Sequence, residues 1–264
     1  MRRSLILLSS ALLLCAGCSG SSDGGRKDGA GSASGARSLA PVVRDAVAET
    51  GRGTVRIGER IELGDGSSTY TMNLTGAFDL GRDKGRLAVE LPGGAVGRLE
   101  EVFAGDMVYL RGAQDLEGRW GATSRDGAEA HYLLRAPLND PEHVLRQVAA
   151  MREVAKLGPE KVNGVTAVRY RGTLDHATVT LRLAKSTREK ADRLRDGLGG
   201  ELPVFADAWI DGRGRVVRAR LSFEGVGNVK VTMNLSDFGK PVKAAPPSPA
   251  DAVLLGKTSG ILLG

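Results

Sequence analysis

Apolar and polar residues alternate with a period of two over long stretches of this chain, and this alternation constrains its fold more than any other feature. In residues 68–80, Tyr70, Met72 and Leu74 fall on one side of an extended chain, and threonines and an asparagine fall on the other. Such a pattern is typical of antiparallel strands that pack one face on a core and expose the other to water. We therefore expect a large antiparallel sheet whose single apolar face is covered by helices or closes around a cavity.

Predicted strands cover most of the chain after residue 53. The clearest group is a three-strand meander within residues 203–235, in which Asp211-Gly212-Arg213-Gly214 supplies the first hairpin turn. In this meander, alternation assigns Val217 and Leu221 to the same apolar face. The predicted strands are 54–63, 68–80, 87–91, 98–103, 107–111, the region of Trp120, 161–174, 177–183, 203–210, 215–223 and 229–235.

Three segments have helical periodicity instead. Residues 39–49 have apolar residues at helical spacing, and residues 140–157 carry an apolar stripe with Asp140 as a possible N-cap and Pro141 in the first turn. Residues 185–198 are rich in lysine, arginine and glutamate, which predicts a solvated surface helix. The expected fold class is α+β: a large curved antiparallel sheet with helices packed on or across its concave side.

The first 17 residues have the features of a secretory signal peptide. Two arginines precede an apolar stretch from Leu5 to Leu14, which is shorter than the roughly 20 residues that span a bilayer as a helix. Ala16-Gly17-Cys18 follows and resembles the lipobox of bacterial lipoproteins, in which the cysteine is acylated and becomes the new N-terminus. The simpler alternative is an ordinary signal peptide with an incidental cysteine. We expect a lipid anchor at Cys18 that holds the protein on the extracytoplasmic face of the cell membrane.

The segment after the leader predicts a flexible tether. Residues 18–38 are almost all glycine, serine, alanine and charged residues, a composition that cannot bury a core. A glycine-rich coil of about 20 residues has a root-mean-square reach of roughly 25 Å. The expected organisation is therefore a signal peptide in 1–17, a lipidated tether in 18–38, a folded domain in 39–253 and a C-terminal tail in 254–264.

The charge distribution and the cysteine positions argue against nucleic-acid binding and against an internal disulfide. The formal net charge is +6, and the basic residues are spread along the chain, which is not the concentrated basic patch of a nucleic-acid-binding protein. Both cysteines, Cys15 and Cys18, lie at the leader boundary, so the domain has no internal disulfide. Its stability must come from packing and sheet hydrogen bonds.

Several features together resemble the actinobacterial lipid-binding lipoproteins of the lipoprotein-carrier-like superfamily. These features are the leader ending in Ala16-Gly17-Cys18, the tether, the helix within the strand series, the hairpin at residues 206–218 and the proline-rich close at residues 246–251. The resemblance covers most of residues 39–253. It implies a half-open β-barrel backed by helices, an apolar cavity that binds or carries an acyl-chain lipid or lipoglycan, and no enzymatic activity.

Eight apolar residues of the predicted strands are candidates for lining such a cavity. Each of them can equally be ordinary core. They are Met72, Leu74, Phe205, Trp209, Leu221, Phe223, Val231 and Met233.

Two other functions remain open from the sequence. The chain can be a non-catalytic envelope sensor that binds a protein partner through the same fold. It can also be an envelope enzyme, because Asp207 and Asp211 flank Trp209 and two carboxylates can catalyse glycoside hydrolysis, although an exposed strand face and a turn aspartate explain them more simply. Five arginines on the polar faces of predicted strands are expected either to be solvated or to contact anionic lipid head groups. They are Arg169, Arg171, Arg182, Arg218 and Arg220.

No metal site, cofactor site or catalytic motif is predicted. The three histidines, His131, His143 and His176, are scattered and lack the spacing of zinc ligands. His143 and His176 are expected to be solvated.

The anchor is directly testable. Replacing the acylated residue, Cys18→Ala, should release the protein from the membrane fraction, because a folded domain without its lipid chains has no stable attachment. Cys15→Ala is the matched control and should leave the protein anchored, because Leu14 makes Cys15 a poor acceptor. Mass spectrometry of the mature N-terminus checks both variants; an unmodified Cys18 in the wild-type protein would contradict the prediction.

Overall fold

In this computed structural model, one open sheet provides the framework of the folded unit. Its strands are β1 (Thr54–Gly64), β2 (Thr69–Asp79), β3 (Lys84–Glu90), β4 (Arg98–Ala104), β5 (Met107–Arg111), β6 (Trp120–Ser124), β7 (Arg152–Val162), β8 (Val165–Thr173), β9 (Val204–Asp211), β10 (Val216–Phe223), β11 (Val229–Ser236) and β12 (Ala252–Leu254). The order across the sheet is β12-β6-β5-β4-β3-β2-β1-β11-β10-β9-β8-β7. The sheet is antiparallel apart from the parallel β12–β6 pair. This curved, unclosed sheet confirms the predicted fold class.

The structure describes residues 38–64, 67–91, 97–112, 116, 118–225 and 228–255. All of them belong to one compact unit, Arg37–Gly264. The predicted leader, Cys18 and nearly all of the tether lie outside the described residues, as does most of the predicted tail.

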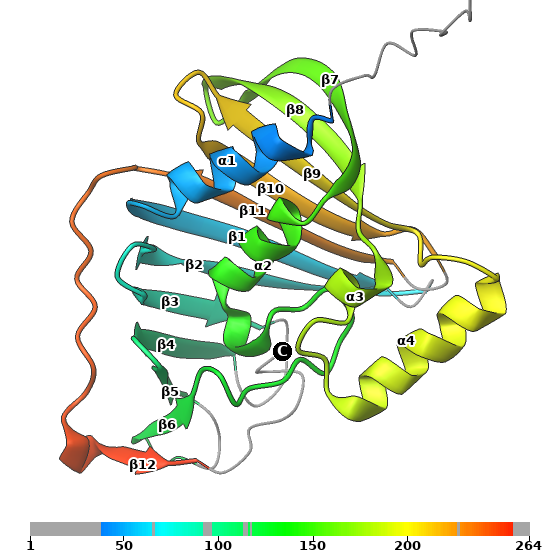
Figure 1. Cartoon of the computed structure of the whole chain (residues 1–264). Helices are drawn as coiled ribbons and strands as arrows, with labels where there is room; N and C mark the ends of the chain where they lie inside the picture. Colours follow the sequence, from blue (N-terminus) through cyan, green and yellow to red (C-terminus); the bar gives the residue numbers. More distant parts are fainter. Residues whose placement is uncertain are drawn as a thin grey trace, which may run out of the picture. The chain divides into compact units, whose positions relative to one another are not determined.

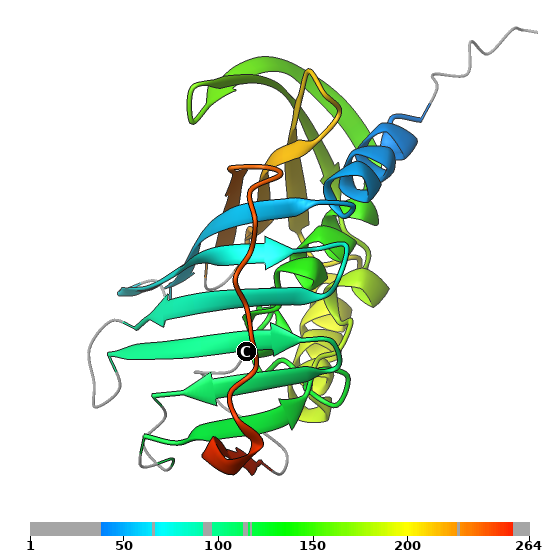
Figure 2. The ribbon, with the colours of Figure 1, turned by 90° about the vertical axis from the view of Figure 1, so that its left-hand side faces the viewer.

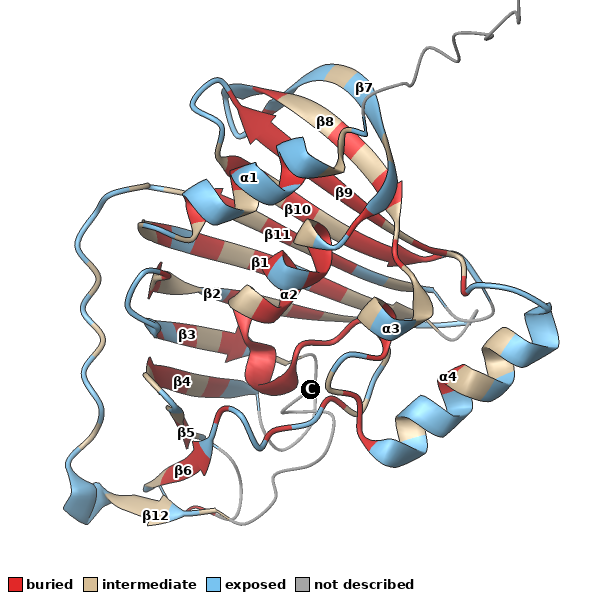
Figure 3. Cartoon of the chain, in the orientation of Figure 1, coloured by how far each residue is buried: buried red, intermediate tan, exposed pale blue. Residues whose placement is uncertain are grey.

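Helices lie on the concave face of the sheet (Figures 1 and 2). They are α1 (Ala40–Thr50), α2 (Pro141–Ala149), α3 (His176–Val179) and α4 (Lys185–Leu198). Single 3-10 turns lie before α2, at Pro137–Asn139, and before the edge strand β12, at Pro249–Asp251. The first two helices bury Val43, Val144 and Val148 against the central strands in one continuous apolar core. Figure 3 shows how buried residues concentrate on α2 and on the strands behind it.

A second, smaller cluster lies on the convex face. Bulges in β7 increase its twist, and the β7–β8 hairpin arches away from the helices (Figure 2). This places Val162 beside Trp209, whose indole Nε1 donates a 2.8 Å hydrogen bond to Glu160. Val217 belongs to this cluster and not to the concave face, so the alternation-based assignment of Val217 was wrong. A register shift between Val216 and Arg218 rotates it to the other side.

A buried polar network connects α2 to the strands beneath it. Asn139, just before α2, donates a 2.8 Å hydrogen bond to Glu101 on β4 and accepts one from Arg135. Asp140 caps α2 by accepting from the Glu142 amide, and it also accepts two hydrogen bonds from Arg125, at 3.1 and 2.8 Å. Because these groups are buried and mutually bonded, they fix the position of α2 on the sheet.

Three secondary-structure predictions were wrong. The single strand predicted over 161–174 is the end of β7 and the whole of β8, joined by a turn at Asn163-Gly164. The helix predicted over 140–157 ends at Ala149, and β7 begins at Arg152, because the segment from Arg152 pairs with β8 as the outermost strand of the sheet. The strand predicted over 177–183 begins instead as the short helix α3, because Asp175 accepts from the Thr178 amide at 2.9 Å and caps it.

The predicted solvation of His143 was also wrong. This side chain is buried on α2, 1 % exposed, and burial lowers its pKa to about 4. His143 is therefore neutral at physiological pH and part of the core.

The buried carboxyl groups make stability depend on pH. Burial raises the pKa of Glu101 to about 8 and that of Glu59 to about 7, well above the value of about 4.3 in an unfolded chain. The folded state therefore binds these protons more tightly, so the free energy of unfolding should fall as the pH rises from about 5 to about 8.

Glu101→Gln should flatten that fall, because glutamine keeps the acceptor for Asn139 but cannot ionise. The difference in the free energy of unfolding between Glu101→Gln and wild type should be more than about 1 kcal/mol larger, in favour of the variant, at pH about 8 than at pH about 5. Chemical denaturation at each pH measures it, with Glu90→Gln, an exposed site on β3, as the control. Parallel curves for Glu101→Gln and wild type would contradict the assignment.

Candidate ligand-binding groove

The charged helix α4 is attached to the rest of the fold by hydrogen bonds at its start and by a contact at Asp192. At its start, the Ala184 amide donates to the Ala130 carbonyl at 2.8 Å, and Thr187 donates to the His131 carbonyl at 3.1 Å. Farther along, Asp192 contacts the Nε2 atom of His176 at 2.6 Å. The helix ends at Gly199, which has the left-handed conformation (φ 68°) that glycine adopts without strain.

The apolar side of α4 is incompletely covered. Of the 14 residues of this helix, all described, only Ala191 is buried. Leu194 is half-buried, and Leu198 is 54 % exposed. The prediction of a solvated surface helix holds for most of α4, but two of its apolar side chains, Ala191 and Leu194, line a groove.

An apolar groove of about 340 Å³ lies between α4 and the end of the sheet. Its volume is at the lower end of the range of small-molecule sites. α4 contributes Ala191 and Leu194, and the loop before α2 contributes Tyr132 and Leu133. The rim of the sheet, defined here as the neighbouring ends of β1, β10 and β11, contributes Leu63, Gly64, Phe223 and Val229; His131, Thr187 and Lys190 complete the lining.

This arrangement suits an apolar ligand better than a reaction. Aliphatic and aromatic side chains dominate the walls, and burying each methylene group of a ligand there is favourable by about 0.8 kcal/mol. No group of histidines, cysteines and carboxylates suitable for holding a metal ion occurs among the described residues.

The eight candidate lining residues do not share one side of the sheet. Six of them belong to the concave core: Met72, Leu74, Leu221, Phe223, Val231 and Met233. Trp209 lies in the convex cluster, and Phe205, two residues earlier on β9, faces the same side beneath the guanidinium of Arg171. Among the eight, Phe223 lines the α4 groove. Whether the others contact a ligand stays a prediction.

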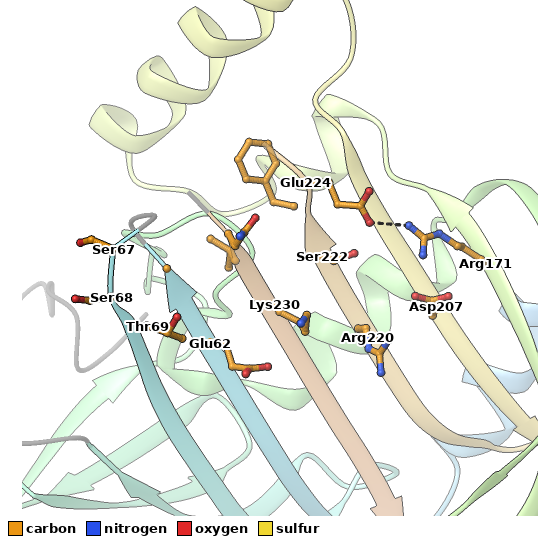
Figure 4. A pocket seen from close by; sticks show the side chains of 14 residues that line it. Glu62, Ser67, Ser68, Thr69, Arg171, Asp207, Arg220, Ser222, Glu224 and Lys230 are labelled. Atoms are coloured by element: carbon orange, nitrogen blue, oxygen red, sulfur yellow. Dashed lines mark hydrogen bonds and ion pairs between the residues drawn. The ribbon is translucent and has the colours of Figure 1, made fainter. Parts of the chain in front are cut away.

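A second hollow lies on the convex side of the same rim, with a volume of about 510 Å³. Its walls are polar and come from six strands (Figure 4). The lining residues are Glu62, Gly64, Ser67, Ser68, Thr69, Arg171, Asp207, Arg220, Ser222, Phe223, Glu224, Asn228, Val229 and Lys230. We call it the convex pocket. It shares Gly64, Phe223 and Val229 with the α4 groove, so the two sites meet across the rim.

The aspartates considered for catalysis have other partners. Asp207 pairs with Arg169 at 2.8 Å. Asp211 stabilises the hairpin turn by accepting from the amides of Arg213 and Arg215, and the Arg215 guanidinium holds its pKa below the usual range despite partial burial. A carboxyl with a lowered pKa is a poor general acid, so this pair is read as structural.

The five arginines on the polar strand faces also differ from the simple expectation of solvation. Arg169, Arg218 and Arg220 place their guanidinium groups 5.0–5.6 Å from the ring of Trp209. Arg171 pairs with Glu224 at 2.9 Å. Arg182 is not on a strand and donates to the Ala128 carbonyl at 2.9 Å.

The sequence contains a weak signal for the groove that alternation could not reveal. Ala191 and Leu194 lie about one turn apart in a strongly charged helix, and Tyr132-Leu133 lie in a loop with no periodicity. They become neighbours of Leu63 and Val229 only when the chain folds.

No helix among the described residues combines the length and apolar character needed to cross a membrane.

No protein-family model matches this sequence. An uncharacterized 31.2 kDa protein of Streptomyces griseus is 29 % identical over 116 residues, which are 43 % of this chain and 38 % of that protein. The chain thus matches well under half of the length of this relative.

Among solved structures, the chain is similar to LprF from Mycobacterium bovis, with 15 % identity, a TM-score of 0.49, and coverage of 80 % of this chain and 97 % of that one. It is also similar to the lipoprotein LppX of Mycobacterium tuberculosis, with 15 % identity, a TM-score of 0.46, and coverage of 78 % and 98 %. A putative outer-membrane lipoprotein-sorting domain from Vibrio parahaemolyticus matches with 13 % identity, a TM-score of 0.30, and coverage of 75 % and 90 %. These similar structures include mycobacterial proteins and lipoproteins.

Proposed function

We propose that this protein is a membrane-anchored lipoprotein that binds an acyl chain of a lipid or lipoglycan on the extracytoplasmic side. The acyl chain occupies the α4 groove. The observation that carries this proposal is the apolar groove of about 340 Å³ beneath a helix that is too polar to fill it.

The walls of the groove define the class of ligand. Leu133, Leu194 and Val229 come from three separate parts of the fold and offer only aliphatic contacts. Such walls reward a hydrocarbon chain through the hydrophobic effect and give a polar ligand no compensation for its lost hydration. Lys190, also in the lining, supplies one cation for a carboxylate or phosphate at the polar end of the chain.

The depth of the site follows from the packing around it. Phe223 lines the groove and also belongs to the concave core, so it is the expected first contact between an entering chain and the interior. Leu221 and Met233 are buried in the same core. They would contact the ligand only after the helices above them move.

The anchor and the groove serve one purpose in this proposal. A lipidated Cys18 followed by a tether with a reach of roughly 25 Å keeps the groove close to the membrane surface, where acyl chains are available. The protein then acts by binding, without catalysis and without a cofactor.

Docking of an envelope protein is the second candidate, and the exposed leucines favour it. Leu198 at the end of α4 and Leu181 after α3 are both exposed. A protein partner would contact these outward side chains, whereas an acyl chain would contact Leu194 in the groove.

Two leucines of α4 therefore separate the candidates. Leu194→Asp should weaken binding of a fluorescent fatty acid, 11-(dansylamino)undecanoic acid, by about tenfold or more. The substitution replaces an apolar side chain of the groove wall with a charged one, and the lost apolar contact costs at least about 1.5 kcal/mol of binding free energy. Leu198→Asp makes the same substitution on the same helix but outside the groove, so it should leave the affinity unchanged. Fluorescence titration measures both.

Equal affinities in the two variants would contradict the groove assignment. Absence of saturable binding by the wild-type protein would contradict acyl-chain binding altogether. Loss of a co-purifying envelope protein only in Leu198→Asp would favour the second candidate.

A further inference from the structure

The convex pocket contains a buried carboxylate that the protein itself only half satisfies. Asp207 is 1 % exposed. Its Oδ1 atom accepts from the Nε atom of Arg169 at 2.8 Å, but its Oδ2 atom meets no protein donor among the described residues. A buried carboxylate oxygen without a donor is costly, so this atom marks a place where a ligand can supply a hydrogen bond.

A buried hydrogen-bond donor without an acceptor in the described part of the chain lies on the neighbouring strand, at Arg220. Arg220 on β10 pairs in register with Asp207 on β9, which places their Cβ atoms about 5 Å apart. The Nε atom of Arg220 is buried and has no acceptor among the described residues, while its guanidinium stacks on Trp209 at 5.1 Å. Two residues of the pocket lining, on neighbouring strands, therefore carry one unmet acceptor and one unmet donor, both buried beneath the pocket surface.

The charges of the pocket lining favour neither an anionic nor a cationic ligand. Three cationic side chains, Arg171, Arg220 and Lys230, face three carboxylates, Glu62, Asp207 and Glu224. Arg171 and Glu224 are already paired at 2.9 Å (Figure 4). A phosphate would lie against Asp207, and an ammonium group would lie against Arg220, so either ion meets a like charge.

A hydroxyl group fits both unmet atoms, because it donates one hydrogen bond and accepts others. Two hydroxyls on adjacent carbons can donate to Asp207 Oδ2 and accept from Arg220 Nε at the same time. Ser222, buried on the same face, and Thr69 add further hydroxyl partners.

We propose that the convex pocket binds a neutral, hydroxyl-rich group, namely a sugar or another polyol, through Asp207 and Arg220. This site is separate from the acyl-chain groove and does not require it. The three shared rim residues allow two sources for the same chemistry: a free saccharide, or the sugar head group of an amphiphile whose chain lies in the α4 groove.

The test uses Trp209 as the reporter in a Trp120→Phe background, because the chain has two tryptophans. Methyl glycosides of glucose and mannose should change the Trp209 fluorescence with saturation. Asp207→Asn should weaken this binding by about tenfold or more, since a hydrogen bond to a charged group is lost. Asp237→Asn, the same change at an exposed site after β11, is the control.

A second variant tests the pocket in case Asp207→Asn does not fold. Ser222→Val keeps a residue suited to a strand and leaves Asp207 and Arg169 paired, but it narrows the pocket and removes a hydroxyl, so it should weaken the same titration. Octyl glucoside below its critical micelle concentration separates the two sources. If octyl glucoside binds more tightly than the methyl glycoside, and Leu194→Asp removes that difference, the ligand is the head group of an amphiphile. If the two glycosides bind equally, the ligand is a free saccharide.

Two results would overturn the proposal. One is the absence of saturable binding for every glycoside. The other is glycoside binding that Asp207→Asn leaves as tight as Asp237→Asn does. Neither result affects the fatty-acid titration, so failure of the convex pocket and failure of the proposed acyl-chain function can be told apart.

Discussion

An open sheet with one apolar face has to hide that face from water, and the rest of this molecule follows from how the helices do so. The helices α1 and α2 bury Val43, Val144 and Val148 over the central strands. The next helix along this face, α4, is so strongly charged that it can bury little more than Ala191. The sheet is therefore covered in the middle and left partly uncovered at one rim, and that rim is where both hollows lie.

Polar contacts inside the core determine where α2 lies on the sheet. The Asn139–Glu101 hydrogen bond and the Arg125–Asp140 pair hold the start of α2 against the sheet. Buried ion pairs recover little net stability after desolvation, but breaking one partner is costly. Their effect here is positional: α2 cannot slide over the strands without leaving buried charges unpaired, whereas α4 has no comparable connection to the strands among the described contacts.

Much of the framework was predictable from the sequence, because alternation is a local signal. Strict alternation identified the strands of the 203–235 meander, and charge identified the helix α4, Lys185–Leu198. The failures also have local causes. An exposed edge strand such as β7 has no buried face to enforce alternation, and a bulge beside Val216 moved Val217 to the opposite side of the sheet.

The sites were less predictable, since they depend on contacts between distant segments. Apolar alternation selects residues that pack deeply, so it found Leu74 and Met233 in the core but not Leu133 or Leu194 in the groove. The unmet atoms of Asp207 and Arg220 depend on strand register, which no single stretch of sequence encodes.

Photocross-linking tests the central claim most directly. A fatty acid that carries a diazirine at its chain end would be bound to the full-length protein, irradiated and mapped by peptide mass spectrometry. The acyl-chain groove predicts cross-links to Leu63, Leu194 and Phe223, which line it from the sheet and from α4. Cross-links confined to outward-facing apolar residues such as Leu157 and Leu254 would contradict it.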